Sequence, residues 1–223
     1  VPLHGKHYEL FLHKDELFEF LQSEAGMACQ AIYHLGACSS TTETNWNFLL
    51  ENNVEYSQKI FSWCARQRVR LIYASSAAVY GNGQRGFSDA VPTGTFEPLN
   101  LYGKSKWMFD QWVEQQVETP AHWYGVRFFN VYGPGEYHKG DMASVVLKAF
   151  HQVKSAGYLR LFRSHNPDFR DGEQMRDFVY VKDVVDWLYQ QLSSGYPSGI
   201  FNMGSGRART WLDLARQVFR SLH

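Results

Sequence analysis

The chain has 223 residues, of which 44% are hydrophobic and 16% aromatic, and its 22 basic side chains balance its 22 acidic ones. A zero formal net charge without a sustained basic run argues against a nucleic-acid or membrane-surface protein. No stretch approaches the roughly 18 apolar residues of a membrane span, and no signal peptide opens the chain. Cys29, Cys38 and Cys64 lack any Cys-x-x-Cys spacing, so neither a disulfide framework nor a metal site is indicated, and we expect a soluble, cytoplasmic protein.

The first half of the chain alternates short apolar runs with amphipathic segments. Residues 31–35 are predicted to form a strand, residues 45–68 one or two helices, and residues 69–75 the next strand. A helix over residues 102–117 and a strand over residues 123–129 follow. This βαβαβ succession predicts an α/β fold, a Rossmann-like doubly wound parallel sheet with helices on both faces.

After Pro134 the pattern becomes irregular. We predict a helix over 143–154, a short strand over 158–162, a polar loop over 165–175, a strand over 178–181, a helix capped by Asp183 and running through Leu192, a strand over 199–204 and a final helix capped by Thr210. Residues 1–134 are interpreted as a partial dinucleotide-binding domain. Residues 135–223 are interpreted mainly as a small substrate lobe interleaved with sheet elements.

Tyr102 and Lys106 form the first candidate catalytic pair. They lie four residues apart in a predicted helix, so their side chains share one face. An ammonium close to a phenol lowers the tyrosine pKa, which makes Tyr102 a candidate general acid and base. Ser76 ends a predicted parallel strand, where α/β sheets gather ligand chemistry, and could bond the oxygen of a reacting alcohol or ketone. The alternatives are a surface Tyr/Lys pair and a serine that only satisfies loop backbone.

A glycine-rich phosphate turn is missing from the expected place. Dinucleotide folds open with a strand and Gly-x-Gly-x-x-Gly at a helix N-terminus. Residues 81–86 match this spacing, but they lie between Ser76 and Tyr102 and open no convincing helix, so we interpret them as a loop with glycines at turns. We therefore expect the chain to lack the first two strands of the fold and the helix between them.

A resemblance to a known family rests on six segments: HLGACSSTTE (34–43), YASSAAVYG (73–81), LNLYGKSK (99–106), FNVYGP (129–134), HKGDMASV (138–145) and RDFVYV (176–181). Over nearly its whole length the chain resembles the extended short-chain dehydrogenase/reductase superfamily, the NAD-dependent epimerases and dehydratases. The GACSSTTE and HKGxMAS segments are typical of its heptose epimerases. The other segments are shared across the superfamily.

The resemblance implies a bound nicotinamide cofactor, NADP with NAD as the alternative, and no metal. Its cofactor-binding residues would be Gly36, Ala37, Cys38, Ser39, Asn52, Lys106 and Val131. Lys139 would join Tyr102, Ser76 and Lys106 as a catalytic residue, although an ordinary solvated loop lysine is the alternative. The substrate-binding residues would be Ser76, Asn130, Lys139, Asp141, Lys148, Phe162, Arg163, Ser164, His165 and Arg176.

The implied activity is inversion of C6 of the heptose in ADP-activated D-glycero-D-manno-heptose, through a 6-keto intermediate, for lipopolysaccharide core synthesis. The family also implies a homo-oligomer with an ADP-heptose substrate. Dehydratases place Asp-Glu after the Ser/Thr, where this chain has Ala77 and Ala78, so elimination is disfavoured. Another sugar-nucleotide epimerase or a reductase stays open as an alternative. A non-catalytic nucleotide-binding remnant also stays open, as does an inactive fragment of an active enzyme.

Overall fold

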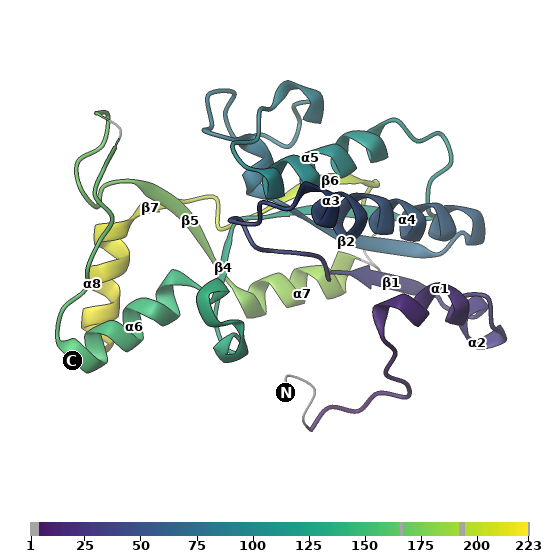
Figure 1. Ribbon diagram of the computed structural model, residues 1–223, viewed down its shortest axis with the longest axis horizontal. Helices are drawn as coiled ribbons and strands as arrows, with labels where there is room; N and C mark the ends of the chain where they lie inside the picture. Colours follow the sequence, from purple (N-terminus) through teal and green to yellow (C-terminus); the bar gives the residue numbers. More distant parts are fainter. Residues whose placement is uncertain (1–4, 166, 192–194, 223) are drawn as a thin grey trace.

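A computed structural model describes residues 5–165, 167–191 and 195–222 (Figure 1). Within these residues, the main sheet has four parallel strands in the order β1-β2-β3-β6. The strands are β1 (Ala31–His34), β2 (Arg70–Ser76), β3 (Trp123–Phe128) and β6 (Gly199–Met203). The prediction of a parallel α/β sheet is confirmed. Because all four strands run the same way, their carboxyl ends meet at one edge of the sheet.

A second, smaller sheet contains β4 (Asn130–Tyr132), β5 (Met175–Tyr180) and β7 (Ala208–Thr210). β4 pairs with β5 in parallel, and β5 pairs with β7 antiparallel. β4 follows β3 after one residue, and β7 lies a short turn beyond β6. The small sheet therefore begins where the main sheet ends.

The helical elements, in chain order, are η1 (Lys14–Glu16), α1 (Leu17–Phe20), α2 (Glu24–Met27), α3 (Trp46–Leu49), the π-helical η2 (Leu50–Glu55), α4 (Tyr56–Gln67), η3 (Ala77–Tyr80), η4 (Thr93–Thr95), α5 (Leu101–Glu114), η5 (Tyr137–Met142), α6 (Val145–Ala156), α7 (Val181–Gln191) and α8 (Trp211–Leu222). In Figure 1, α4 and α5 lie on one side of the main sheet and α7 on the other. None of the described helices is both long and apolar enough to cross a membrane.

The apolar run of β2 is buried on both faces, as the strands of parallel sheets are. Leu71 and Tyr73 pack with Phe61 of α4 and Phe109 of α5. Ile72 points the other way, into a cluster that contains Leu188 of α7. This two-sided burial explains why the run shows no polar alternation in the sequence.

The small sheet is covered by α6 and α8, which lie beside it and away from the main sheet (Figure 1). Thr210 caps α8, as predicted. Its Oγ1 accepts a hydrogen bond from Asp213 N at 3.0 Å, and Asp213 Oδ2 accepts one from Thr210 N at 3.2 Å. This reciprocal pair satisfies two backbone donors at the start of the helix.

Two local predictions are wrong. Residues 158–162 form no strand. Their alternating Leu159 and Leu161 pack against the α6–α8 cluster, so burial explains the pattern without a partner strand. Asp183 does not cap α7, because that helix begins at Val181, directly after β5, and places Asp183 in its first turn. Leu192, where this helix was expected to end, lies outside the described residues.

Candidate active site

Ser76 and Tyr102 meet at the carboxyl edge of the main sheet. Ser76 is the last residue of β2, and its hydroxyl lies close enough to the Tyr102 phenol, in the first turn of α5, to lower the pKa of that phenol as a hydrogen-bond partner. Gly103 allows this approach: a Cβ built there would lie 2.8 Å from the carbonyl oxygen of Ala78. The fold therefore brings together two residues that the sequence separates by a long loop.

Tyr102 is nearly buried, with 9% of its surface exposed. Burial raises its pKa above the ordinary tyrosine value, and the hydrogen bond from Ser76 opposes this only in part. The prediction that Lys106 brings the pKa of Tyr102 toward neutrality is wrong in sign for this structure. Loss of hydration outweighs the effect of Ser76, and the electrostatic effects of Cys38 and Asp110 raise the pKa of Tyr102 further.

Lys106 lies one helical turn below Tyr102 and is 5% exposed. Its Nζ donates a hydrogen bond to the carbonyl oxygen of Ala74 at 2.9 Å. Burial lowers the pKa of Lys106 to about 8, and the negative charge of Asp110 acts against this. The ammonium is therefore readily deprotonated for a lysine.

The segment that follows β1 lies beside these residues. Cys38 acts electrostatically on both Tyr102 and Lys106. Buried Asn53 fixes its backbone: Asn53 Oδ1 accepts from Cys38 N at 2.9 Å, and Asn53 Nδ2 donates to Cys38 O at 3.0 Å. Gly36, Ala37 and Ser39 around it are exposed. The segment is thus held rigidly while its surface stays accessible.

Asn53, and not the predicted Asn52, faces this segment. Asn52 Nδ2 donates to the carbonyl oxygen of Phe48 within its own helix. Asn53 Nδ2 also donates to Ser105 Oγ of α5 at 3.0 Å, so one amide joins three elements. Both asparagines lie in π-helical η2, an irregular geometry often found at functional sites. Two adjacent asparagines in the sequence carry no signal that distinguishes them.

Lys139 lies exposed in η5, on the segment between Gly133 and Ser144. Glu136 joins the two ends of this segment: its carboxylate accepts from Gly133 N at 3.3 Å and from Ser144 Oγ at 2.7 Å, and also from Ser144 N. Burial raises the pKa of Glu136, but the hydrogen bonds from Ser144 and Gly133 outweigh it, and the net pKa is lowered. Sequence reasoning missed Glu136.

Asn130 and Val131 begin β4, where the two sheets meet. Asn130 Nδ2 donates to the carbonyl oxygen of Asp177 at 3.2 Å. Val131 packs against the apolar cluster on the α7 side of the main sheet. The side chain of Asp177 accepts hydrogen bonds from Ser205, just after β6.

The remaining predicted substrate-binding residues fall into two groups. Lys148 of α6 donates from Nζ to the carbonyl oxygen of Asp141 at 2.6 Å, which places this pair beside the Lys139 segment. Phe162 and Arg176 both contact Trp211, with a ring-centroid distance of 5.4 Å for Phe162 and a guanidinium-to-ring distance of 5.9 Å for Arg176. Trp211, which sequence reasoning did not assign to the site, brings these two together.

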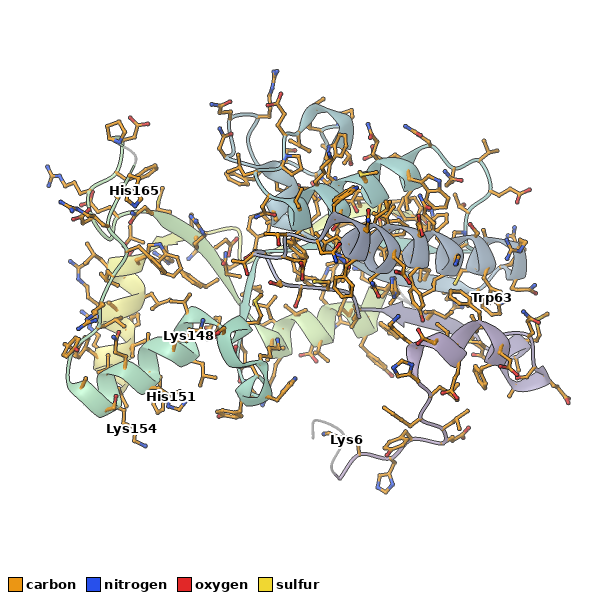
Figure 2. All side chains as sticks on the ribbon, in the orientation of Figure 1. Lys6, Trp63, Lys148, His151, Lys154 and His165 are labelled. Atoms are coloured by element: carbon orange, nitrogen blue, oxygen red, sulfur yellow. The ribbon has the colours of Figure 1, made fainter. Side chains whose placement is uncertain are left out.

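Arg163, Ser164 and His165 lie further along the same loop. Figure 2 shows His165 on the part of the loop that projects beyond β5 and β7, away from Lys148 on α6. Ser164 N donates to Asp171 Oδ1 at 2.7 Å, which closes the loop on itself. The structure therefore does not bring the whole predicted substrate set into one cluster.

Two cavities open elsewhere in the described residues. One of about 580 Å³ lies against α4 and includes Trp63 and Trp112. The other, of about 690 Å³, lies between α6, α8 and the small sheet, and includes Tyr132, Arg207 and Arg209. Neither is lined by a predicted site residue. The candidate site is the edge of the main sheet and not either cavity.

The fold is that of an α/β protein of the Rossmann type, with its polar cluster at the carboxyl ends of the parallel strands. A model of the NAD dependent epimerase/dehydratase family matches residues 9–204, and the chain belongs to this family. The family depends on a nicotinamide cofactor.

Two curated relatives are similar to nearly the whole chain. ADP-L-glycero-D-manno-heptose-6-epimerase of Fusobacterium nucleatum is 47% identical over 99% of this chain and 68% of its own length. The protein of the same name from Nitratidesulfovibrio vulgaris is 46% identical over 98% of this chain and 68% of its own length. The chain thus spans about two thirds of these relatives.

A solved structure is also similar to this chain. The crystal structure of Helicobacter pylori ADP-L-glycero-D-manno-heptose-6-epimerase superposes with a TM-score of 0.82 at 27% identity. The match covers 99% of this chain and 67% of that one.

Proposed function

We propose that this chain is a sugar-nucleotide epimerase that inverts C6 of the heptose in ADP-activated D-glycero-D-manno-heptose, a step of lipopolysaccharide core synthesis. The observation that carries the proposal is the meeting of Ser76 and Tyr102 at the edge of the sheet, where Ser76 acts on the pKa of the phenol, with Lys106 one turn below. The names of the relatives at 46–47% identity support the same substrate.

The residues at this edge fit a nicotinamide cofactor. Gly36, Ala37 and Ser39 expose a backbone that Asn53 holds in place through Cys38, and Lys106 lies beside it with an ammonium suited to a ribose hydroxyl. These residues, with Asn53 or Asn52 and Val131, would hold the group. When bound, the nicotinamide would take a hydride from C6 and return it.

The C6–H bond of an alcohol is not acidic, so inversion by direct deprotonation is unfavourable. Transient oxidation to a 6-keto intermediate removes the stereocentre, and reduction from the opposite face restores it inverted. The hydroxyl proton must leave and return as the ketone forms and disappears. Tyr102 exchanges this proton on one face, with Ser76 hydrogen-bonded to the same oxygen, and Lys139 exchanges it on the other.

The substrate would lie between the main sheet and the small sheet. In this arrangement Asn130, Asp141 and Lys148 contact the sugar or its phosphates, and Arg176 binds a diphosphate oxygen through its planar guanidinium. The turn from Phe162 to His165 would help to hold the sugar nucleotide. Residues 1–134 then act mainly on the cofactor and residues 135–223 mainly on the substrate.

Three finer properties rest on the family resemblance alone. We propose NADP as the cofactor, with NAD as the alternative, a homo-oligomeric state and a cytoplasmic location. Nicotinamide released by denaturing the purified chain, identified by mass, distinguishes the two cofactors.

The test is conversion of ADP-D-glycero-D-manno-heptose by the purified chain with added NADP, followed by NMR of the C6 proton. Inversion at C6 with an unchanged ratio of oxidised to reduced nicotinamide supports the proposal. Net consumption of reduced nicotinamide would identify a reductase and overturn it. Failure both to convert the substrate and to bind nicotinamide would also contradict it, and would favour an inactive fragment of an active enzyme.

A further inference from the structure

Three successive turns of α5 meet three consecutive residues of β2. Tyr102 lies beside Ser76, which acts on its pKa, Lys106 Nζ donates to the carbonyl oxygen of Ala74 at 2.9 Å, and Ser75 Oγ donates to Asp110 Oδ2 at 2.8 Å. The helical residues are spaced by four, so they form one column on the buried face of α5. Their exposed fractions fall from 9% at Tyr102 to 5% at Lys106 and 0% at Asp110. The column therefore ends in a fully buried carboxyl group.

Asp110 is held as a hydrogen-bond acceptor. Its Oδ2 also accepts from Arg127 Nε at 3.0 Å, and both side chains are fully buried. Oδ1 is buried with no hydrogen-bond partner among the described residues. Burial raises the pKa of Asp110, and Arg127, Ser75 and Lys106 act against this. A carboxyl group that only accepts is in the pattern of its ionised form. A buried charge of this kind is costly unless it has a function or a partner.

Arg127 is itself fixed on every side. Nη1 donates to the Tyr80 hydroxyl at 3.1 Å and Nη2 to Thr93 Oγ1 at 2.6 Å, and the guanidinium lies over the rings of Tyr80 and Phe96. These contacts leave Nε directed at Asp110. The position of Asp110 behind Lys106 is thus determined by β3 as well as by α5.

The titratable groups around Lys106 come from four elements. His34 and Cys38 lie on β1 and just after it, Tyr73 lies on β2 and Arg127 on β3. Tyr102 and Asp110 lie on α5 with Lys106. Burial lowers the pKa of His34 to about 4, with a smaller contribution from the charge of Lys106, so His34 is neutral at physiological pH. Among the groups that favour the charged form of Lys106, Asp110 has the largest effect and Cys38 the next.

We propose that Asp110 is a positioning residue whose negative charge holds the Lys106 ammonium protonated beside Tyr102, and that Arg127 fixes Asp110 for this purpose. The claim that a protonated Lys106 helps to bind the cofactor rests on the function proposed above. The claim that Asp110 acts electrostatically on Lys106 does not depend on that function. The two claims are therefore tested by separate measurements.

The direct measurement is the titration of Lys106 by NMR of ¹³Cε-labelled lysine, with the signal assigned by Lys106→Met. Asp110→Asn alone would leave Arg127 buried without a counter-charge, so the test variant is Asp110→Asn with Arg127→Gln, which removes both charges. Asn keeps the shape of Asp110, whereas Gln is shorter than Arg127 and gives up its hydrogen bonds to Tyr80 and Thr93. Arg127 is not among the groups that shift Lys106, so loss of Asp110 governs the outcome. The midpoint should move from about pH 8 to about pH 7 or lower.

Glu114→Gln is the matched control. It removes a carboxylate one turn further along α5 that binds Thr93 and is not among the groups acting on Lys106. Its Lys106 midpoint should remain that of the native chain. An unchanged midpoint in the double variant would overturn the inference, and so would an equal shift in Glu114→Gln.

The second measurement is the Kd for NADP between pH 6 and pH 9. In the native chain, affinity should weaken above about pH 8, and in the double variant the weakening should begin about one pH unit lower. A fall in affinity that is uniform with pH would show a purely structural role and overturn the inference. If neither the native chain nor a variant binds NADP or NAD at any pH, the proposed function fails, and the NMR midpoint still decides the role of Asp110.

Discussion

Tyr102 depends on small neighbours for its position. Gly103 lets α5 approach the turn after β2, and Ser105 Oγ donates back to the carbonyl oxygen of Tyr102 at 2.7 Å while accepting from Asn53. The phenol can therefore reach Ser76. The same close packing buries the phenol, and burial raises the pKa of Tyr102. At the scale of the residue, the site is defined by close packing as much as by charge.

Replacing Tyr102 by Phe should leave the fold intact, because it removes one hydroxyl that hydrogen-bonds Ser76. C6 epimerisation should fall by about 10²–10⁴-fold, the usual contribution of a positioned acid or base. Conversion of ADP-heptose is the readout, with the Tm and bound nicotinamide measured on the same sample. Near-native turnover would remove Tyr102 from the mechanism.

His34 should make the stability of the chain depend on pH. Ser57 Oγ donates to the carbonyl oxygen of Asn53, so it accepts from His34 Nε2–H at 2.8 Å, a donor that both the neutral and the charged imidazole can supply. Burial and Lys106 lower the pKa of His34 to about 4, whereas in the unfolded chain it returns to the ordinary value. The unfolded state then binds more protons, so stability is lost as the pH falls from about 6.5 to about 4, by roughly 3 kcal/mol in total.

Urea unfolding at a series of pH values checks this expectation. His34→Gln should flatten the curve between pH 6.5 and pH 4. His122→Gln, at an exposed histidine, is the control and should leave the slope unchanged. A native slope that survives in His34→Gln would assign it to other groups.

At the scale of elements, the segment from Gly133 to Ser144 is the part of the site that depends most on a single side chain. Glu136 accepts from both of its ends, and Lys139 N donates to the carbonyl oxygen of Glu136 at 3.0 Å. Ser144 is also the N-cap of α6, with its Oγ accepting from Leu147 N. The position of Lys139 therefore depends on Ser144, which is fixed at the N-terminus of α6.

Glu136→Gln should lower turnover by about 10²-fold, because an amide cannot accept from all three donors and Lys139 would lose its fixed position. The free energy of unfolding should fall by about 1–3 kcal/mol. Epimerisation rates and urea unfolding are the measurements, and Glu118→Gln, at an exposed glutamate, is the control. Equal activity in Glu136→Gln and Glu118→Gln would contradict a role for Glu136 in the site.

At the scale of the whole molecule, Asp177 joins the two sheets. It lies on β5, and its carboxylate accepts from Ser205 N, Ser205 Oγ and Gly206 N in the turn after β6. Gly204 is required here, because a Cβ would lie 2.5 Å from Asp177 Oδ2. This turn therefore helps to fix the small sheet against the main sheet, together with the direct passage from β3 to β4.

Asp177→Asn should lower the free energy of unfolding by about 1–2 kcal/mol, because an amide can no longer accept from all three donors. For a chain of this size the Tm should drop by about 2–8 °C. Thermal unfolding is the measurement, compared with Asp186→Asn on the exposed side of α7. If both variants have the same Tm, the turn does not depend on Asp177.

The strands and most helices could be predicted because apolar runs and caps are local signals. β2 is a continuous apolar run, and Thr210 starts α8 as its spacing from Asp213 indicates. Residues 158–162 were misjudged because alternation reports burial and not a partner strand. Asn52 was preferred to Asn53 because only the π-helical turn decides which of two equal neighbours faces Cys38.

The sequence by itself determined the parallel α/β class, the Tyr102/Lys106 face of α5 and the family, because these depend on periodicity, spacing and motif. The tertiary structure alone decided the sign of the pKa shift of Tyr102, the roles of Glu136 and Asn53, and the Asp110–Arg127 pair behind Lys106. The physical reason is that desolvation and hydrogen-bond partnership depend on residues far apart in the chain, and their contacts exist only once the sheet has formed.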